Sequence, residues 1–211
     1  METKDFTNEE LLKKHLTKAE DSFKTKLRLF LFNCVLNLNG KFDEEHFLNF
    51  EISDNLVLQY TAEYYQLDWR KKENKINGIL INDIYYRMKD LMKNNQDGIN
   101  NLKEEYKNHT FKKIFSLEDF KKMIEKQVCS YCGISEEEIN KLIDRKQIFK
   151  KAQRGWTMEI DRKNSNFEYS RDNCVPACYW CNNAKTDEFT YEEFREIGET
   201  FKIIWNKRLE K

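Results

Sequence analysis

Two CxxC pairs constrain the fold of this chain more than any other feature of its sequence. Cys129 and Cys132 form the first pair, and Cys178 and Cys181 form the second. A CxxC loop brings two thiolates within reach of one ion, and two such loops complete the tetrahedral ligand set of zinc. Because thiolates fill all four positions, we expect a structural zinc ion with no open coordination site. The ion would join two segments whose own core is too small to fold alone.

Composition limits the classes of protein that remain. The chain has 211 residues, with 37 Lys+Arg against 37 Asp+Glu, so a nucleic-acid surface requires local clustering of basic residues. One Pro and six Gly favour a helix-rich architecture. No apolar run approaches the roughly 18–20 residues that span a bilayer, and the charged N-terminus lacks a secretory signal. We therefore expect a soluble, cytoplasmic protein in which Cys34 and Cys174 are small buried residues.

The N-terminal half is predicted to be helical. Apolar residues recur at helical spacing over residues 8–30, the run 27–38 is apolar nearly all round, and Asn39-Gly40 ends it. Residues 50–68 are compatible with strand or helix, Asn77-Gly78 marks a turn, and residues 79–92 have helical periodicity. The polar stretch 93–109 is interpreted as a loop or boundary. We expect a helix-rich domain over residues 1–112 and a second domain over residues 113–211.

The second half contains clearer signals. Ser116, Ser135 and Thr190 each precede an acidic residue by three positions, a pattern typical of helix N-termini. Residues 155–161 alternate as in a half-buried strand, with Trp156, Met158 and Ile160 inward. The last helix is expected to bury one stripe of side chains: Phe194, Ile197, Phe201, Ile204 and Trp205. The fold class that follows is α+β and mostly helical.

Three short motifs lie between and around the cysteines. They are Glu159-Ile-Asp161-Arg162, Tyr169-Ser-Arg-Asp-Asn173 and Cys181-Asn182-Asn183-Ala-Lys185. With the CxxC pairs, their order resembles the HNH (ββα-metal) nuclease family over roughly residues 125–195. The resemblance implies a zinc-stabilised strand–loop–strand–helix module that binds one divalent cation and cuts nucleic acid, with DNA favoured.

Site residues are carried over position by position from the resemblance. Asp161 and Asn182 match the positions of the family's metal ligands. Asn173 matches the asparagine that braces the loop by hydrogen bonds. Lys185 lies one helical turn after Asn182, where the resemblance implies that it can reach a phosphate. Carboxylate and amide oxygens suit a hard cation, so Mg²⁺ or Mn²⁺ is expected at this second site.

Arg162 departs from the family pattern, in which a histidine acts as general base at this position. A guanidinium with a pKa above about 12 cannot accept a proton from water. Three interpretations remain open. Arg162 stabilises transition-state charge while Glu159 or Tyr169 takes the proton; the metal generates hydroxide without a dedicated base; or the module only binds nucleic acid.

Basic residues cluster between the first CxxC pair and the predicted strand. This cluster is interpreted as a phosphate-binding patch or as an ordinary solvated face. The candidates for nucleic-acid binding are Lys146, Lys150, Lys151, Arg154, Lys163 and Lys185. The leading hypothesis is thus an HNH endonuclease. The alternatives are an inactive zinc module that binds nucleic acid, and a subunit of a larger complex whose N-terminal half binds a partner or a second copy of the chain.

Overall fold

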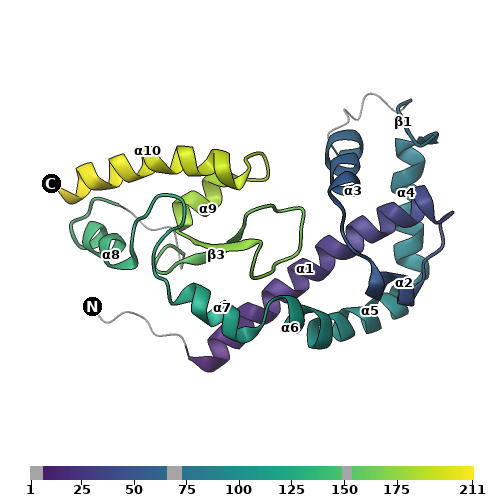
Figure 1. Cartoon of the computed structure of the whole chain (residues 1–211), viewed down its shortest axis with the longest axis horizontal. Helices are drawn as coiled ribbons and strands as arrows, with labels where there is room; N and C mark the ends of the chain where they lie inside the picture. The colour runs from purple at the N-terminus through teal and green to yellow at the C-terminus, as the bar shows by residue number, and fades with distance from the viewer. Residues whose placement is uncertain (1–6, 66–72, 149–153) are drawn as a thin grey trace. The chain divides into compact units, whose positions relative to one another are not determined.

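The chain forms two compact units. Unit 1 consists of Met1–His15, Ile114–Ser165 and Tyr169–Lys211, and unit 2 of Leu16–Lys113 and Asn166–Glu168. The computed structural model describes residues 7–65, 73–148 and 154–211. Helices dominate and the sheets are small, so the predicted α+β, mostly helical class is confirmed (Figure 1). The division into domains after residue 112 stays a prediction.

Unit 1 combines helices with one hairpin. Its elements are the start of α1 (Asn8–Asn37), the end of α6 (Phe111–Ile114), α7 (Leu117–Ile124), α8 (Glu136–Asp144), β3 (Glu159–Arg162), β4 (Cys174–Ala177), α9 (Tyr179–Lys185) and α10 (Tyr191–Leu209). The three helix starts predicted from the sequence are confirmed. Ser116, Ser135 and Thr190 each accept a hydrogen bond from the backbone N–H three residues on, and the last two form complete capping boxes.

The hairpin is the element that positions the candidate site. β3 and β4 pair antiparallel, with Glu159 opposite Ala177 and Asp161 opposite Val175. Cys178 follows β4 and caps α9, so the expected strand–loop–strand–helix order is present. The strand starts later than predicted because pairing with β4 begins at Glu159. Trp156 lies before that point and is 38% exposed, so its predicted inward orientation was wrong.

The core of unit 1 packs around the cysteine cluster. Phe194 and Trp205 of α10 are buried against it, with Ile197 and Phe201 partly buried. Ile204 is 42% exposed, so this member of the predicted stripe was wrong. It lies one position before Trp205, about 100° around the helix, where the buried face has already ended.

Unit 2 contains the remaining helices and a short hairpin. Its elements are most of α1, α2 (Glu44–Asn49), α3 (Asp54–Leu58), the π-helical turns η1 (Gln59–Tyr65), β1 (Lys75–Ile76), β2 (Ile79–Leu80), α4 (Ile81–Asn94), α5 (Gln96–Glu105), η2 (Tyr106–Thr110) and the start of α6. The apolar run 27–38 is a buried helix that ends at Asn37, as predicted. Asn77-Gly78 joins β1 to β2 with both residues at positive φ, as a tight hairpin turn requires.

The polar stretch 93–109 is helical, so its assignment as a loop was wrong. α5 and η2 bury Ile99, Leu102 and Tyr106. These apolar residues recur three and four positions apart, and a narrow buried stripe is enough to hold a helix whose other faces are solvated. Among the described residues, no helix has the length and apolar character needed to cross a membrane.

Three residues of the loop between β3 and β4, Asn166–Glu168, belong to unit 2. Phe167 packs against its apolar cluster. Glu168 accepts a hydrogen bond from the hydroxyl of Tyr106. Lys26 is buried, and its ammonium lies 5.4 Å from the ring centroid of Phe47. Burial lowers the pKa of Lys26 and raises the pKa of Glu168, while the attraction between the two groups opposes both shifts.

We expect Gly198→Ala to destabilise the protein. A Cβ at this position of α10 would collide with the backbone carbonyl of Tyr131, in the first CxxC loop. Overpacking of this kind costs about 1–3 kcal/mol, more than the roughly 1 kcal/mol that Ala gains over Gly in a helix. Urea unfolding should therefore show a lower midpoint. Thr200→Ala, an exposed change on the same helix, is the control and should raise or preserve the midpoint. Equal stability of the two variants would contradict this packing.

Candidate functional site

The four cysteines of the two CxxC pairs converge on one point. Cys129, Cys132, Cys178 and Cys181 are all buried, and their Sγ atoms lie within 4.8 Å of one another. The Sγ atoms of Cys132 and Cys178 are 3.8 Å apart. A tetrahedron with Zn–S bonds of about 2.3 Å has edges of about 3.8 Å, so the spacing fits zinc. The cluster can hold a zinc ion, and the part of the chain that the structure describes contains no second such group of His, Cys, Asp or Glu.

Local backbone geometry forms each half of the cluster. In the first CxxC loop, Gly133 has a φ of +70°, and its N–H donates to the carbonyl of Cys129 at 2.9 Å. The N–H of Ser130 donates to the carbonyl of Pro176 at 2.9 Å, which ties this loop to β4. In the second half, Cys178 caps α9 and Cys181 lies on its first turn. The first CxxC loop, strand β4 and the first turn of α9 are therefore sufficient to bring the four thiols together.

Without a cation, ionisation of one thiol of the cluster opposes ionisation of its neighbours. Hydrogen bonds from the neighbouring thiols lower the pKa of Cys129, and thiol–thiol hydrogen bonds raise the pKa of Cys178 and of Cys181. One negative charge is thus favoured and further ones are opposed. A divalent cation removes this opposition, because it binds the thiolate form of each ligand.

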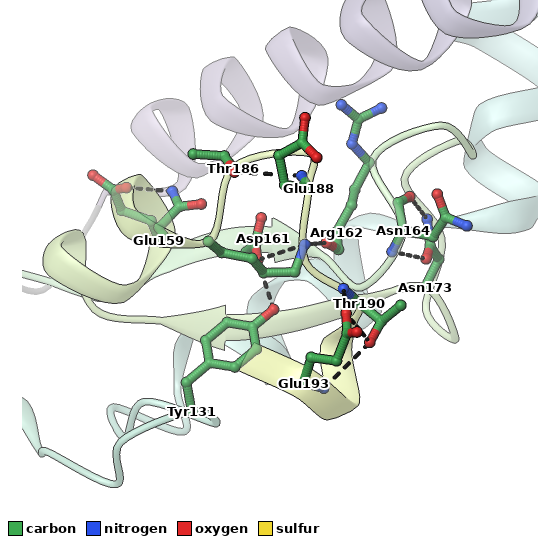
Figure 2. Close-up of polar contacts among 12 residues, drawn as sticks. Tyr131, Glu159, Asp161, Arg162, Asn164, Asn173, Thr186, Glu188, Thr190 and Glu193 are labelled. Carbon is green, nitrogen blue, oxygen red and sulfur yellow. Dashed lines mark hydrogen bonds and ion pairs between the residues drawn. The ribbon is translucent and has the colours of Figure 1, made fainter. Parts of the chain in front are cut away.

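Asp161 lies at the end of β3 in a largely enclosed position. Its Oδ2 atom accepts a hydrogen bond of 2.6 Å from the hydroxyl of Tyr131, as Figure 2 shows. The ammonium of Lys185 lies 3.8 Å from the same oxygen. The side chain of Asp161 is only 15% exposed, and burial raises its pKa despite these contacts. Asp161 is therefore a carboxylate that two neighbours orient through one oxygen.

Tyr131 is a site residue that the sequence analysis missed. It lies between the two ligands of the first CxxC loop, and its ring packs edge-on against Phe194, 5.1 Å between centroids. An aromatic residue between two cysteines is expected to pack in the core, and no local sequence pattern predicts that its hydroxyl reaches Asp161. The motif Cys-Ser-Tyr-Cys was the available signal.

Lys185 is buried, at 2% exposure, and does not lie at the surface as a phosphate-binding residue would. Its ammonium donates to the carbonyl of Arg162 at 3.0 Å, so it holds the end of β3 as well as Asp161. We therefore assign it no phosphate contact.

Glu159, two residues before Asp161 on β3, contacts Asn182 of α9. The Nδ2 atom of Asn182, on α9, donates to Oε2 of Glu159 at 2.5 Å. Arg154 binds the same carboxylate with two hydrogen bonds, Nε to Oε1 at 2.8 Å and Nη2 to Oε2 at 2.6 Å. The predicted nucleic-acid residue Arg154 and the predicted base Glu159 are thus paired with each other.

Asn173 closes the loop between the two strands. Its Nδ2 donates to the carbonyl of Asn164 at 3.0 Å, and its Oδ1 accepts from the N–H of Asn164 at 3.0 Å (Figure 2). At the end of β3, the guanidinium of Arg162 lies 4.7 Å from the ring centroid of Tyr169, a residue of this loop. This cation–π contact holds the guanidinium against Tyr169.

The predicted basic patch is brought together only in part. Lys163 follows β3 directly, and its ammonium lies 5.4 Å from the ring of Tyr191. Lys146 is exposed and makes no side-chain contact with these groups in the described part of the chain. Lys150 and Lys151 lie outside the described residues.

Comparison with known proteins gives one likeness to a solved structure. No family model and no curated protein matches the chain. The chain is similar to the rare-cutting HNH restriction endonuclease PacI, with 29% sequence identity and a TM-score of 0.38. The match covers 44% of this chain and 66% of that one, a little under two thirds of its length.

We expect Cys178→Ser to lose zinc. Replacing one thiolate leaves three strong ligands, so metal analysis of the purified full-length protein should fall well below one zinc per chain, with a lower melting temperature. Cys174→Ala is the matched control, because Cys174 is also buried but lies outside the cluster. One zinc per chain in Cys178→Ser would show that this cysteine is not a ligand.

Proposed function

We propose that the protein is a metal-dependent endonuclease of the HNH type that hydrolyses phosphodiester bonds, with DNA as the favoured substrate. The observation that carries the proposal is the position of Asp161 and Asn182. Asp161 is the third of the four residues of β3, and Asn182 follows the last cysteine on α9, within one ββα arrangement that the cysteine cluster closes. The resemblance of roughly residues 125–195 to HNH nucleases supports the same assignment.

The donor atoms available here fit a hard divalent cation. The Oδ1 atom of Asn182 accepts no hydrogen bond from any residue that the structure describes, because only Nδ2 of this amide is engaged. Both side-chain contacts of Asp161 use Oδ2. A carboxylate oxygen and an amide oxygen suit Mg²⁺ or Mn²⁺, whose remaining positions water and phosphate oxygens can fill. When bound, such a cation supplies Lewis-acid polarisation of the phosphodiester.

The protein groups around this position have separate tasks. Arg162 supplies positive charge for the developing negative charge on phosphorus-bound oxygens, since a guanidinium cannot act as a base. Tyr131 and Lys185 keep Asp161 oriented. The hydrogen bonds of Asn173 fix the loop that bears Tyr169, and Lys163 extends the positive surface toward the phosphate backbone.

A non-catalytic nucleic-acid-binding module is the second candidate, and the absence of histidine from the site favours it. The three histidines, His15, His46 and His109, all precede the ββα segment. This candidate predicts binding that weakens as salt rises, with no cleavage under Mg²⁺ or Mn²⁺.

We expect Asp161→Asn to abolish cleavage. The substitution keeps the size of the side chain and an acceptor for Tyr131 but removes the charge that attracts the cation, so cutting should fall by about 100-fold or more. The assay is cleavage of supercoiled plasmid, single-stranded DNA and RNA with Mg²⁺ or Mn²⁺. Asp172→Asn is the control, because Asp172 lies on the loop between β3 and β4 with its side chain 88% exposed. Undiminished cutting by Asp161→Asn would exclude this site, and a wild type that binds but never cuts would favour the second candidate.

A further inference from the structure

Arg154 and Glu159 form a two-pronged ion pair beside the proposed metal site. Both oxygens of the carboxylate are used, at 2.8 and 2.6 Å from two different nitrogens of the guanidinium. This fork-to-fork geometry fixes the plane of the carboxylate as well as its position. The guanidinium also lies 4.9 Å from the ring centroid of Tyr179, the first residue of α9. Arg154 is therefore held in place although its side chain is 53% exposed.

Glu159 in turn determines how the amide of Asn182 is oriented. An ionised carboxylate only accepts hydrogen bonds, so the atom of the amide that faces it must be the donor, Nδ2. The acceptor, Oδ1, then faces away from Glu159. The oxygen and nitrogen ends of an amide are nearly equivalent in shape. Without a neighbour that only accepts hydrogen bonds, the side chain can therefore present either end.

We propose that Glu159 is a positioning residue that, held by Arg154, directs the Oδ1 atom of Asn182 toward the divalent cation. The inference rests on the proposed function and deepens it. It assigns Glu159 and Arg154 tasks other than general base and phosphate contact. Hydrogen-bonded neighbours that orient a metal ligand contribute about 10- to 100-fold to metal affinity.

Electrostatics and positioning predict opposite effects for the loss of Arg154. Removing a positive charge near a cation site strengthens cation binding when charge alone matters. Removing the group that holds Glu159 weakens cation binding when orientation matters. The direction in which the cation affinity changes on loss of Arg154 therefore distinguishes the electrostatic effect from the positioning effect. Loss of Glu159 weakens cation binding under both effects, so it cannot distinguish them.

The test is titration of the zinc-loaded, full-length protein with Mn²⁺ in the absence of nucleic acid, by calorimetry or by the electron paramagnetic resonance of free Mn²⁺. We expect Arg154→Ala to bind Mn²⁺ about 10-fold more weakly than the wild type. Lys163→Ala is the matched control, because it removes a positive charge next to the end of β3 without touching Glu159. Its Mn²⁺ affinity should be equal to or higher than that of the wild type.

Each outcome has a distinct meaning. Equal or tighter Mn²⁺ binding by Arg154→Ala, with zinc content and melting temperature preserved, would overturn the inference and leave the nuclease proposal intact. Wild-type binding that does not weaken in Asp161→Asn would instead overturn the proposed metal site, and the inference with it. Weaker binding by Arg154→Ala and Asp161→Asn but not by Lys163→Ala supports both.

Discussion

The convergence of four thiols on one point is the constraint on which the rest of the site depends. Two residues of the candidate site are attached close to a cysteine along the chain. Tyr131 lies between Cys129 and Cys132, and Asn182 follows Cys181 directly. The ion that these thiols can hold fixes their geometry to within a few tenths of an ångström. Because Tyr131 and Asn182 are attached next to these ligands, an ion held by the cluster also constrains the positions of their backbone atoms.

Features encoded within a few neighbouring residues could be predicted from the sequence. The CxxC spacing, the helix starts at Ser116, Ser135 and Thr190, and the turn at Asn77-Gly78 each depend on local chemistry alone. Residues 93–109 were misassigned because their buried face is narrow and their polar residues outnumber the apolar ones. Periodicity, not average polarity, was the informative signal there.

Contacts between distant residues could not be predicted in this way. The hydrogen bond from Tyr131 to Asp161 and the ion pair of Arg154 with Glu159 arise only once the hairpin and the first CxxC loop are in place. Lys185 shows the same limit. Its position in the sequence predicted a contact with phosphate, whereas the fold buries its ammonium near Asp161 and a backbone carbonyl. Sequence reasoning did not predict how these residues are paired.

The loop between β3 and β4 has a consequence for how this chain can be divided or recombined. Phe167 and Glu168 belong to unit 2, and Met1–His15 belongs to unit 1, so each unit is built from separate stretches of chain. A cut between residues 112 and 113 would separate the buried Lys26 from Glu168 and would leave the other fragment without its first helical turns. Recombination by simple fusion at a single junction is thus disfavoured, and the two halves are expected to be inherited together.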